Sequence, residues 1–354
     1  MNYIGSKKSL LEFLEKSIKS VVKEKDFTFS DLFAWTWIVG RFFKEKGHKV
    51  IANDLQYYSF VLNKNYIENH KVLPFYGLQE EIPELFTADL HNAKNLVLDY
   101  LNNLDWIEDF IYKNYSPSGT KWQEFERMYF TDENAKKCDA IRKKIENWKK
   151  EEKITENEYY FLLASLIESI DKVANTASVY GAFLKKFKKS ALNPLILQPA
   201  DFYLNDNEHK VFNEDINKLI VESSHDVVYL DPPYNHRQYC WNYHLLETIA
   251  KYDNPKITWK TWMRVDPEKK SDYCKKAEVK KAFEFLIKNI DAKYIFMSYN
   301  CEWLLTHQEI KEIMKTRWEY WVFTKEYKRF KAGKDRNFKK DSVLEYLHYV
   351  KIRK

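Results

Sequence analysis

The chain has 354 residues and a mass of 42.8 kDa, enough for one large domain or two ordinary ones with a full-sized core. Hydrophobic residues make up 45% and charged residues 31%, which excludes a disordered chain. No stretch reaches the roughly 18 uncharged apolar residues that a membrane helix needs, and residues 1–8 lead into an amphipathic segment instead of a signal peptide. We therefore expect a cytoplasmic protein with no membrane partner.

Positive charge is concentrated in one stretch. The formal net charge is +6, and residues 325–340 alone hold eight basic and two acidic residues, which accounts for the whole excess. Aromatic residues are interleaved with this charge, a pattern that suits a phosphate backbone, although a solvated lysine-rich loop has the same composition. The candidate phosphate contacts are Lys328, Arg329, Lys331, Lys334 and Arg336.

The first seventy residues alternate between strand and helix patterns. Apolar spacing predicts a helix over residues 9–23, a strand over 27–33, and a helix through 41–46 that Gly47 ends. A strand over 49–52 then leads to Asn53 and Asp54, and residues 56–69 read as a helix. This order predicts a parallel sheet with covering helices.

The middle of the chain is predominantly helical, and strand patterns resume after it. We expect strands at 195–197, 226–230 and 294–298, helices at 243–252, 279–289 and 309–314, and a final antiparallel pair at 321–323 and 342–350. The simplest account is an α/β domain formed by residues 1–70 and 191–354. Residues 71–190 would form a helical insertion in it.

The sharpest motif is Asp231-Pro232-Pro233-Tyr234, directly after an apolar strand. Ligands of open α/β sheets bind beyond the carboxyl ends of strands, where this motif falls. An aromatic exocyclic amine is a poor nucleophile, and a carboxylate and a backbone carbonyl can each accept one of its hydrogens and orient its lone pair. Proline provides a rigid carbonyl without an N–H donor, and tyrosine offers a stacking face for an extruded base. The alternative is an ordinary turn at a strand end.

Together with four other segments, this motif resembles the α-class (Dam-like) DNA adenine-N6 methyltransferases. The matching segments are Tyr3 to Lys7, Asp31 to Ala34, Asn53-Asp54, and Ala200 to Phe202. The resemblance implies a Rossmann-like fold that uses S-adenosylmethionine, without a metal, and a target-recognition domain where residues 71–190 lie. It also implies cofactor contacts from Tyr3, Gly5, Lys7, Asp31, Phe33, Asp54, Asp201, Phe202 and Asp231.

The same resemblance implies a substrate. Asp at position 231, where related enzymes acting on other amino groups have Asn, favours adenine in nucleic acid. We expect methylation of adenine N6 in duplex DNA, catalysed by residues 231–234, within a restriction-modification system that can include a cognate endonuclease. Arg237 and Tyr243 are candidate contacts to the DNA or the target base. An RNA adenine methyltransferase is the alternative with the same chemistry.

The chain departs from the family in its glycine-rich loop, where Trp35 and Trp37 stand in place of glycines. Glycine lets a backbone approach a ligand closely, so two indoles here should fill the space meant for the cofactor. This substitution predicts a crippled or absent cofactor site. The chain has 7 glycines and 11 tryptophans, and Trp259, Trp262 and Trp303 also occupy turn-like positions. One hypothesis is that these codons specify glycine in the source organism. If Trp35 and Trp37 are genuine, the alternative is a catalytically impaired DNA-binding module.

Overall fold

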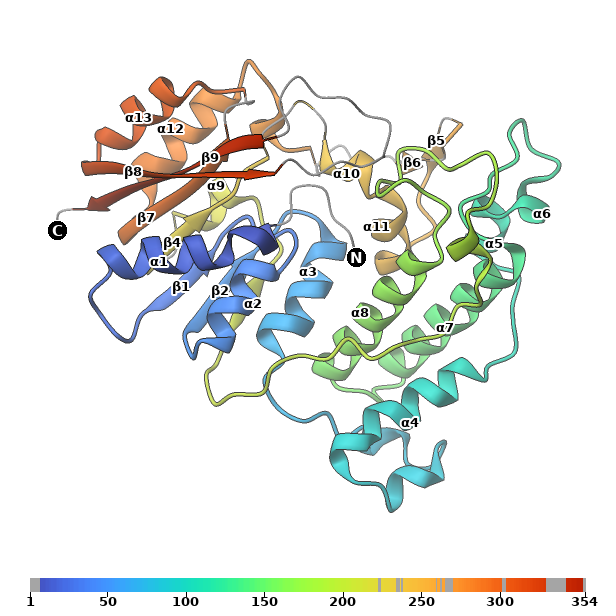
Figure 1. Ribbon diagram of the computed structural model, residues 1–354. Helices are drawn as coiled ribbons and strands as arrows, with labels where there is room; N and C mark the ends of the chain where they lie inside the picture. Colours follow the sequence, from blue (N-terminus) through green and yellow to red (C-terminus); the bar gives the residue numbers. More distant parts are fainter. Residues whose placement is uncertain are drawn as a thin grey trace. The chain divides into compact units, whose positions relative to one another are not determined.

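The computed structural model describes residues 7–221, 224–233, 236, 238–258, 260–261, 263–264, 270–300, 304–328 and 342–352. The chain divides into two compact units, each drawn in Figure 1. A sheet unit consists of residues 3–63, 207–240 and 267–354, and a helical unit contains residues 64–206 and 241–266. The expected insertion, 71–190, lies within the helical unit, which also takes in residues 191–206 and 241–266.

The sheet unit is built on seven strands in the order β3-β2-β1-β4-β7-β9-β8. The strands β1, β2, β3, β4 and β7 are parallel, and β9 runs antiparallel to both of its neighbours. This confirms the expected mostly parallel α/β sheet and the antiparallel pair at its end. The strands are β1 (Thr28–Asp31), β2 (Lys49–Asn53), β3 (Lys210–Phe212), β4 (Ser224–Leu230), β7 (Asp291–Asn300), β8 (Trp318–Lys328) and β9 (Ser342–Ile352).

Helices cover both faces of this sheet because the central strands alternate apolar residues to either side. Phe29 of β1 stacks on Phe43 of α2 with ring centroids 3.8 Å apart. On the other face, Val228 and Leu230 of β4 belong to a buried cluster with α12 and α13. The helices of this unit are α1 (Leu11–Val21), α2 (Ile38–Glu45), α3 (Tyr57–Asn63), α9 (Ile216–Leu219), α12 (Val279–Asn289) and α13 (His307–Lys315), and α10 (Tyr239–Asn242) crosses its boundary.

Two helix ends follow their sequence signals. Gly47 adopts φ +88° directly after α2, so the predicted helix stop is confirmed. At the start of α13, Thr306 and Glu309 form a capping box, in which each side chain bonds to the other's backbone N–H. A 3₁₀ turn, Lys7–Leu10, precedes α1, and another spans Asp272–Cys274. These turns matter because Lys7 and Asp272 both contribute to the site described below.

The helical unit packs around two long helices, α7 and α8. Thr131 and Thr155 cap their first turns through their side chains. The elements of the unit are α4 (Leu90–Asn102), α5 (Phe110–Tyr115), α6 (Pro117–Thr120), α7 (Asp132–Lys150), α8 (Glu156–Lys172), α11 (His244–Lys251), the hairpin β5 (Ile257–Thr258) and β6 (Met263–Arg264), a π-helical turn Lys64–Glu68, and 3₁₀ turns Tyr76–Leu78, Pro83–Phe86 and Lys189–Leu192.

A buried arginine explains why residues 241–266 join the helical unit. Arg142 of α7 donates from Nε to the carbonyl of Ile249 at 2.9 Å and from a terminal nitrogen to Ala250 at 3.0 Å. These carbonyls lie in the last turn of α11, where helical partners are missing, so the guanidinium caps that end. α11 is thereby attached to α7.

One predicted strand is wrong. Residues 194–200 contain neither helix nor strand. The N–H groups of Leu195 and Leu197 donate to the side-chain oxygens of Asn134 at 2.7 Å and Asn102 at 2.8 Å, so they are not available to a strand ladder. The third parallel strand is instead β3, a three-residue segment whose apolar signal is confined to Val211 and Phe212.

Candidate functional site

The carboxyl ends of β1, β2 and β4 enclose a pocket within the sheet unit, at the edge where α/β sheets bind ligands. It is open to solvent, and its empty volume is about 810 Å³ when the open space at its mouth is included. Asp231 and Pro233 of the sharpest motif line it, together with Asp54 beyond β2. Its other lining residues are Leu32, Phe33, Trp35, Asn53, Leu55, Gln56, Glu214, Asp215, Ile216, Asn217, Gln238, Tyr239, Ser271, Asp272 and Tyr273.

Asp231 reaches the pocket while remaining mostly buried. Its side chain is 15% exposed, and its Oδ1 atom forms an ion pair with Lys7 Nζ at 3.1 Å. Lys7 also donates to Glu345 Oε1 at 2.9 Å. Burial raises the pKa of Asp231 to about 6, against the opposing charge of Lys7 and with the added repulsion of Glu345. The motif therefore presents a carboxylate that is costly to ionise but is ionised above about pH 6.

Asp31 is a second buried carboxyl at the same edge. It ends β1 and is 2% exposed, and its Oδ1 atom has no hydrogen-bond partner among the described residues. Burial, and next the charge of Asp231, raise the pKa of Asp31 well above its ordinary value. The edge thus holds two buried carboxyl groups whose charges repel each other, so ionising one makes it harder to ionise the other.

Asp54 lies directly beyond β2 and lines the pocket. Its Oδ1 atom accepts the N–H of Gln56 at 2.8 Å, and its carbonyl accepts the amide of Asn213 at 2.7 Å. The neighbouring Asn53 exchanges two hydrogen bonds with the backbone of Glu214, donating to its carbonyl and accepting from its N–H, each at 3.1 Å. The loops after β2 and β3 are therefore tied together beside the pocket.

Aromatic rings form another side of the pocket. Phe33 meets Tyr273 edge to face, with centroids 5.1 Å apart. Trp35 meets Tyr239 in the same way at 4.8 Å, and its indole N–H donates to the hydroxyl of Tyr58 at 2.7 Å. A pocket with flat apolar walls and a polar acceptor edge suits a heteroaromatic ligand that also carries polar groups.

The two tryptophans of the loop differ in their effect on the pocket. Trp35 lines it, so the expected intrusion of an indole is seen there, but open volume remains beside it. Trp37 is 6% exposed and is not among the lining residues. Its backbone has φ +50°, a left-handed conformation that glycine adopts without strain and that side chains disfavour.

A tryptophan outside this loop also has a positive φ. Trp318, at the start of β8, has φ +131° and is 50% exposed. Glycine would occupy both positions without strain, which agrees with the glycine hypothesis at Trp37 and extends it to Trp318. Positive φ is not confined to tryptophan in the described part of the chain, since Phe75, Glu152, Ser178, Tyr252 and Asn254 also have it. Trp259, Trp262 and Trp303 lie outside the described residues.

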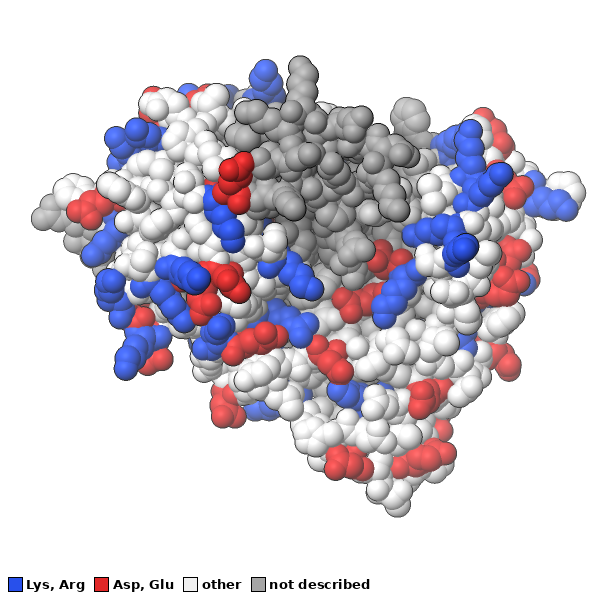
Figure 2. All heavy atoms as spheres, viewed as in Figure 1, with Lys and Arg blue, Asp and Glu red and all other residues white. Residues whose placement is uncertain are grey.

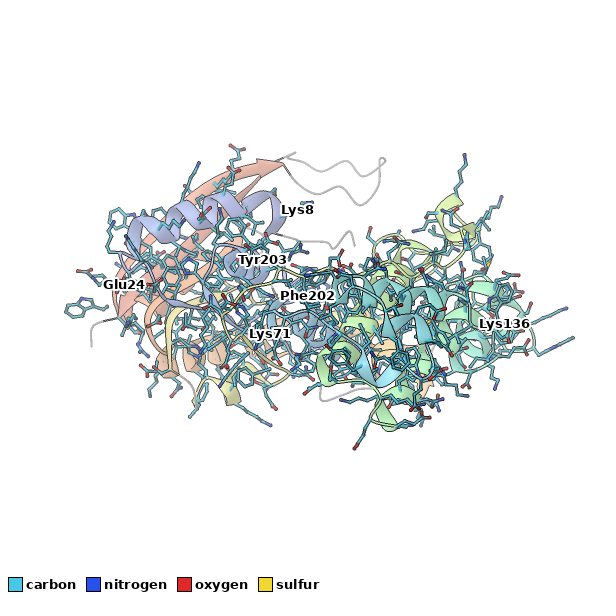
Figure 3. All side chains as sticks on the ribbon, turned by 90° about the horizontal axis from the view of Figure 1, so that it is seen from below. Lys8, Glu24, Lys71, Lys136, Phe202 and Tyr203 are labelled. Carbon is cyan, nitrogen blue, oxygen red and sulfur yellow. The ribbon has the colours of Figure 1, made fainter. Side chains whose placement is uncertain are left out.

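Two expected cofactor residues belong to the helical unit. Asp201 forms an ion pair with Lys94, and Phe202 meets Phe161 of α8 with ring centroids 6.4 Å apart. Figure 3 labels Phe202 beside Tyr203 in the segment that follows the helices. Neither Asp201 nor Phe202 lines the pocket of the sheet unit, and their contact with a cofactor stays a prediction.

The predicted substrate contacts are only partly described. Tyr243 is 2% exposed, with its ring 6.4 Å from that of Tyr180, so it occupies an interior position in the helical unit. Its neighbour His244 is fully buried and contacts the Tyr180 carbonyl through Nε2 at 2.8 Å, as expected for a structural histidine. Outside the described residues lie Tyr3, Gly5, Tyr234, Arg237, Arg329, Lys331, Lys334 and Arg336, and also the side chain of Lys328.

Charge on the described surface is mixed. On the face drawn in Figure 2, Lys and Arg side chains are interspersed with Asp and Glu. Within the described ranges, no group of three or more His, Cys, Asp or Glu residues is arranged to hold a metal ion. Nor do the described helices include one with the length and apolar character to cross a membrane.

Several site residues were not found from the sequence. Gln238 exchanges hydrogen bonds with the backbone of Ser271 at 2.8 and 3.0 Å, which brings the segment around Tyr273 to the pocket. Glu345 lies in β9 and reaches Lys7, which is 338 positions away in the chain. The sequence signal for Glu345 is a charged residue inside an otherwise largely apolar strand.

Comparison with known proteins identifies the family. Residues 3–316 match the model of the D12 class N6 adenine-specific DNA methyltransferases. The chain is 48% identical to type II methyltransferase M.NlaIII of Neisseria lactamica, over 99% of both chains. It is 36% identical to M.CviAII of Paramecium bursaria Chlorella virus 1, over 99% of this chain and 98% of that one.

A longer relative matches over part of its length. Identity to M.FokI of Planomicrobium okeanokoites is 40% over 99% of this chain, which spans 52% of that protein. The sheet order, the pocket beyond β4 and the family match agree with the fold and chemistry that the motifs predict. The chain belongs to the D12 class N6 adenine-specific DNA methyltransferase family.

Proposed function

We propose that the pocket of the sheet unit binds S-adenosylmethionine and that the chain methylates adenine N6 in duplex DNA as the modification enzyme of a type II restriction-modification system. The observation that carries this proposal is the Asp231 carboxylate, which lines the pocket directly after β4 and is paired with Lys7. Four named relatives of the type II and modification-methylase classes support the biological setting.

The pocket's chemistry fits this cofactor. Its acidic lining residues suit a ligand with a sulfonium and an ammonium group, and its aromatic wall suits the adenine ring. These acidic residues are Asp54, Glu214, Asp215, Asp231 and Asp272. We assign Asp54 to the ribose hydroxyls, because it follows β2 at the position where acidic residues of doubly wound folds bind ribose. When bound, the cofactor supplies an electrophilic methyl group.

The chain's own residues would orient the adenine. The Asp231 carboxylate accepts one amino hydrogen, the Pro232 carbonyl accepts the other, and Pro233 stiffens the loop between them. Tyr234 provides the face on which the extruded base stacks, after an unstacking cost of a few kcal/mol. Rate enhancement then comes mainly from holding the amine in line with the methyl group.

Two surfaces would bind the DNA. We assign base reading to the helical unit and phosphate contact to the basic residues from Lys328 to Arg336, with Arg237 beside the target base. A cognate endonuclease recognising the same sequence would be the genetic partner, and the enzyme would act in the cytoplasm where its DNA is.

The test is transfer of tritiated methyl from S-adenosylmethionine to matched duplex DNA and RNA. We expect label in DNA, located on adenine N6 after nuclease digestion, and loss of that label in Asp231→Ala with DNA affinity kept within a few-fold. Label in RNA alone would favour the RNA alternative. Cofactor titration by calorimetry separates the remaining alternative, since a DNA-binding module without activity would bind no cofactor.

A further inference from the structure

A buried carboxylate lies behind the catalytic motif. Glu345 is fully buried in β9, at the register position opposite Asn300 of β7. Its Oε1 atom accepts hydrogen bonds from Lys7 Nζ at 2.9 Å and from the hydroxyl of Ser298. We infer that Glu345 is a positioning residue for methyl transfer, which acts through Lys7 on the Asp231 carboxylate. This inference rests on the proposed role of Asp231.

The contacts form a continuous chain from the interior to the pocket. Ser298 of β7 fixes Glu345, Glu345 fixes the ammonium of Lys7, and that ammonium lies 3.1 Å from Asp231 Oδ1. The exposed fraction of the side chain rises along this series of contacts, from none at Glu345 to 15% at Asp231. Asp231 alone among these four lines the pocket, so Ser298 and Glu345 are connected to it through Lys7 and Asp231.

Sharing the ammonium has a chemical consequence. A buried lysine paired with one carboxylate would neutralise it and weaken it as an acceptor of an amino hydrogen. Because Glu345 holds the same ammonium, Asp231 keeps part of its negative charge, and one of its oxygens is fixed by Lys7 while the other can serve an N–H donor. Glu345 thus keeps Lys7 close enough to orient Asp231 without fully neutralising it.

The other charged groups around Asp231 do not replace this effect. Asp31 at the end of β1 and Glu345 in β9 carry the same sign as Asp231, the Tyr229 hydroxyl of β4 is buried beside it, and Lys7 carries the opposite sign. Of these groups, Glu345 is the one that both repels Asp231 and bonds to Lys7. Removing its charge should therefore lower the pKa of Asp231 and loosen Lys7 together.

The experiment compares single-turnover methylation by wild type and Glu345→Gln across pH, with saturating cofactor and DNA. We expect the rate at about pH 8 to fall roughly tenfold to a hundredfold, the range that a small misplacement of a reacting group produces. The acidic limb of the profile should move to lower pH, while the Kd values for cofactor and DNA stay within about twofold. The matched control is Glu319→Gln, an exposed glutamate of β8 given the same change.

A double-mutant cycle shows whether Glu345 acts through Lys7. Adding Glu345→Gln to Lys7→Met should reduce the rate little further, because the intermediate partner is already gone. Glu345→Asp keeps the negative charge. The acidic limb of its rate–pH profile should therefore lie closer to that of wild type than the acidic limb of Glu345→Gln does. If Glu345→Gln does not fold, Ser298→Ala, which removes the hydroxyl that fixes Glu345, takes its place, and a several-fold slower rate is expected.

The outcomes separate the inference from the proposed function. Wild-type protein that transfers no methyl group would contradict the proposed function itself. Active wild type with a Glu345→Gln variant of equal rate and unchanged pH profile would overturn the inference alone. A uniform loss at every pH, or full additivity with Lys7→Met, would also overturn it, since either result indicates a merely structural role. With Ser298→Ala as the substitute, a rate within about twofold of wild type overturns it.

Discussion

Lys7 Nζ lies 3.1 Å from Asp231 Oδ1, so its ammonium is directed at the carboxylate of the Asp-Pro-Pro-Tyr motif. Burial nevertheless raises the pKa of Asp231 to about 6. The carboxylate can accept an amino hydrogen only when ionised. We expect the single-turnover methylation rate to fall about tenfold for each pH unit below about 6. A rate that stays constant down to about pH 5 would contradict this assignment.

The raised pKa of Asp231 also predicts a stability cost. The folded protein binds this proton more tightly than the unfolded chain, whose value is near 3.8, so the free energy of unfolding falls as pH rises from about 4 to about 6. Asp231→Asn should therefore increase the free energy of unfolding at about pH 7, by up to about 3 kcal/mol, while abolishing methylation. Denaturant titration at about pH 7 and about pH 3.5 checks this, with a gain expected only at the higher pH.

The control for that measurement is Asp99→Asn. Asp99 is an exposed aspartate of α4, so the same chemical change should leave the free energy of unfolding within about 0.5 kcal/mol at both pH values. Equal gains in the two variants would show that the effect does not come from the buried position of Asp231.

Asp54 should affect cofactor binding and not the chemical step. Because it follows β2 at the pocket and is assigned to the ribose hydroxyls, Asp54→Asn should weaken cofactor binding about tenfold, as expected when a charged hydrogen-bond acceptor is lost. The rate at saturating cofactor should change little. Calorimetric titration measures the affinity, and Asp26→Asn, at an exposed position before β1, serves as control. An unchanged Kd would exclude Asp54 from the cofactor site.

Trp318 provides a clean test of backbone strain. Its φ of +131° disfavours any side chain, and its indole is half exposed, so little buried area is lost on removal. Trp318→Gly should raise the free energy of unfolding by about 1 kcal/mol, whereas Trp318→Ala should not. Trp321→Gly, at an exposed position of the same strand without positive φ, should instead be destabilising by about 0.5–1 kcal/mol. Thermal unfolding of the three variants checks this.

Trp35 tests the glycine hypothesis at the cofactor site. The Trp35 side chain lines the pocket. Trp35→Gly should therefore enlarge the pocket and raise the affinity for the cofactor at least several-fold. Peptide mass measurement on protein from the natural source should find glycine at positions 35 and 37. Tryptophan at both positions, encoded by UGG, would refute the hypothesis, and weaker cofactor binding by Trp35→Gly would show that the indole is part of the site.

Local patterns predicted the elements whose signals are strong. The helix expected over 279–289 is α12, and the antiparallel pair at the sheet edge is β8 and β9. The failures have a physical reason. β3 is three residues long and too short to show alternation, while residues 195–197 have a strand-like composition but their N–H groups bond to asparagine side chains.

The sequence indicated only those site residues that lie next to a recognisable strand or motif. Asp54 and Asp231 each follow a strand, so their shared location at one edge could be inferred from topology. Glu345 could not be found in this way, because its partner Lys7 is 338 positions away in a 3₁₀ turn outside the sheet. Its other partner, Ser298, is brought to it by the pairing of β7 with β9. Trp318 was missed because positive φ is a property of the folded backbone and leaves no mark on composition.

The position of β9 between β7 and β8 has a consequence for biosynthesis. This strand comes after the other six in chain order, yet it occupies an internal place in the sheet and carries Glu345. A ribosome-bound chain can therefore hold all of its cofactor-facing loops before the strand that steadies Lys7 has emerged from the exit tunnel. A fragment that ends before β9 would expose an edge of the sheet and would lack the Glu345 carboxylate that holds Lys7. We therefore expect interrupted translation not to release a protein that methylates DNA.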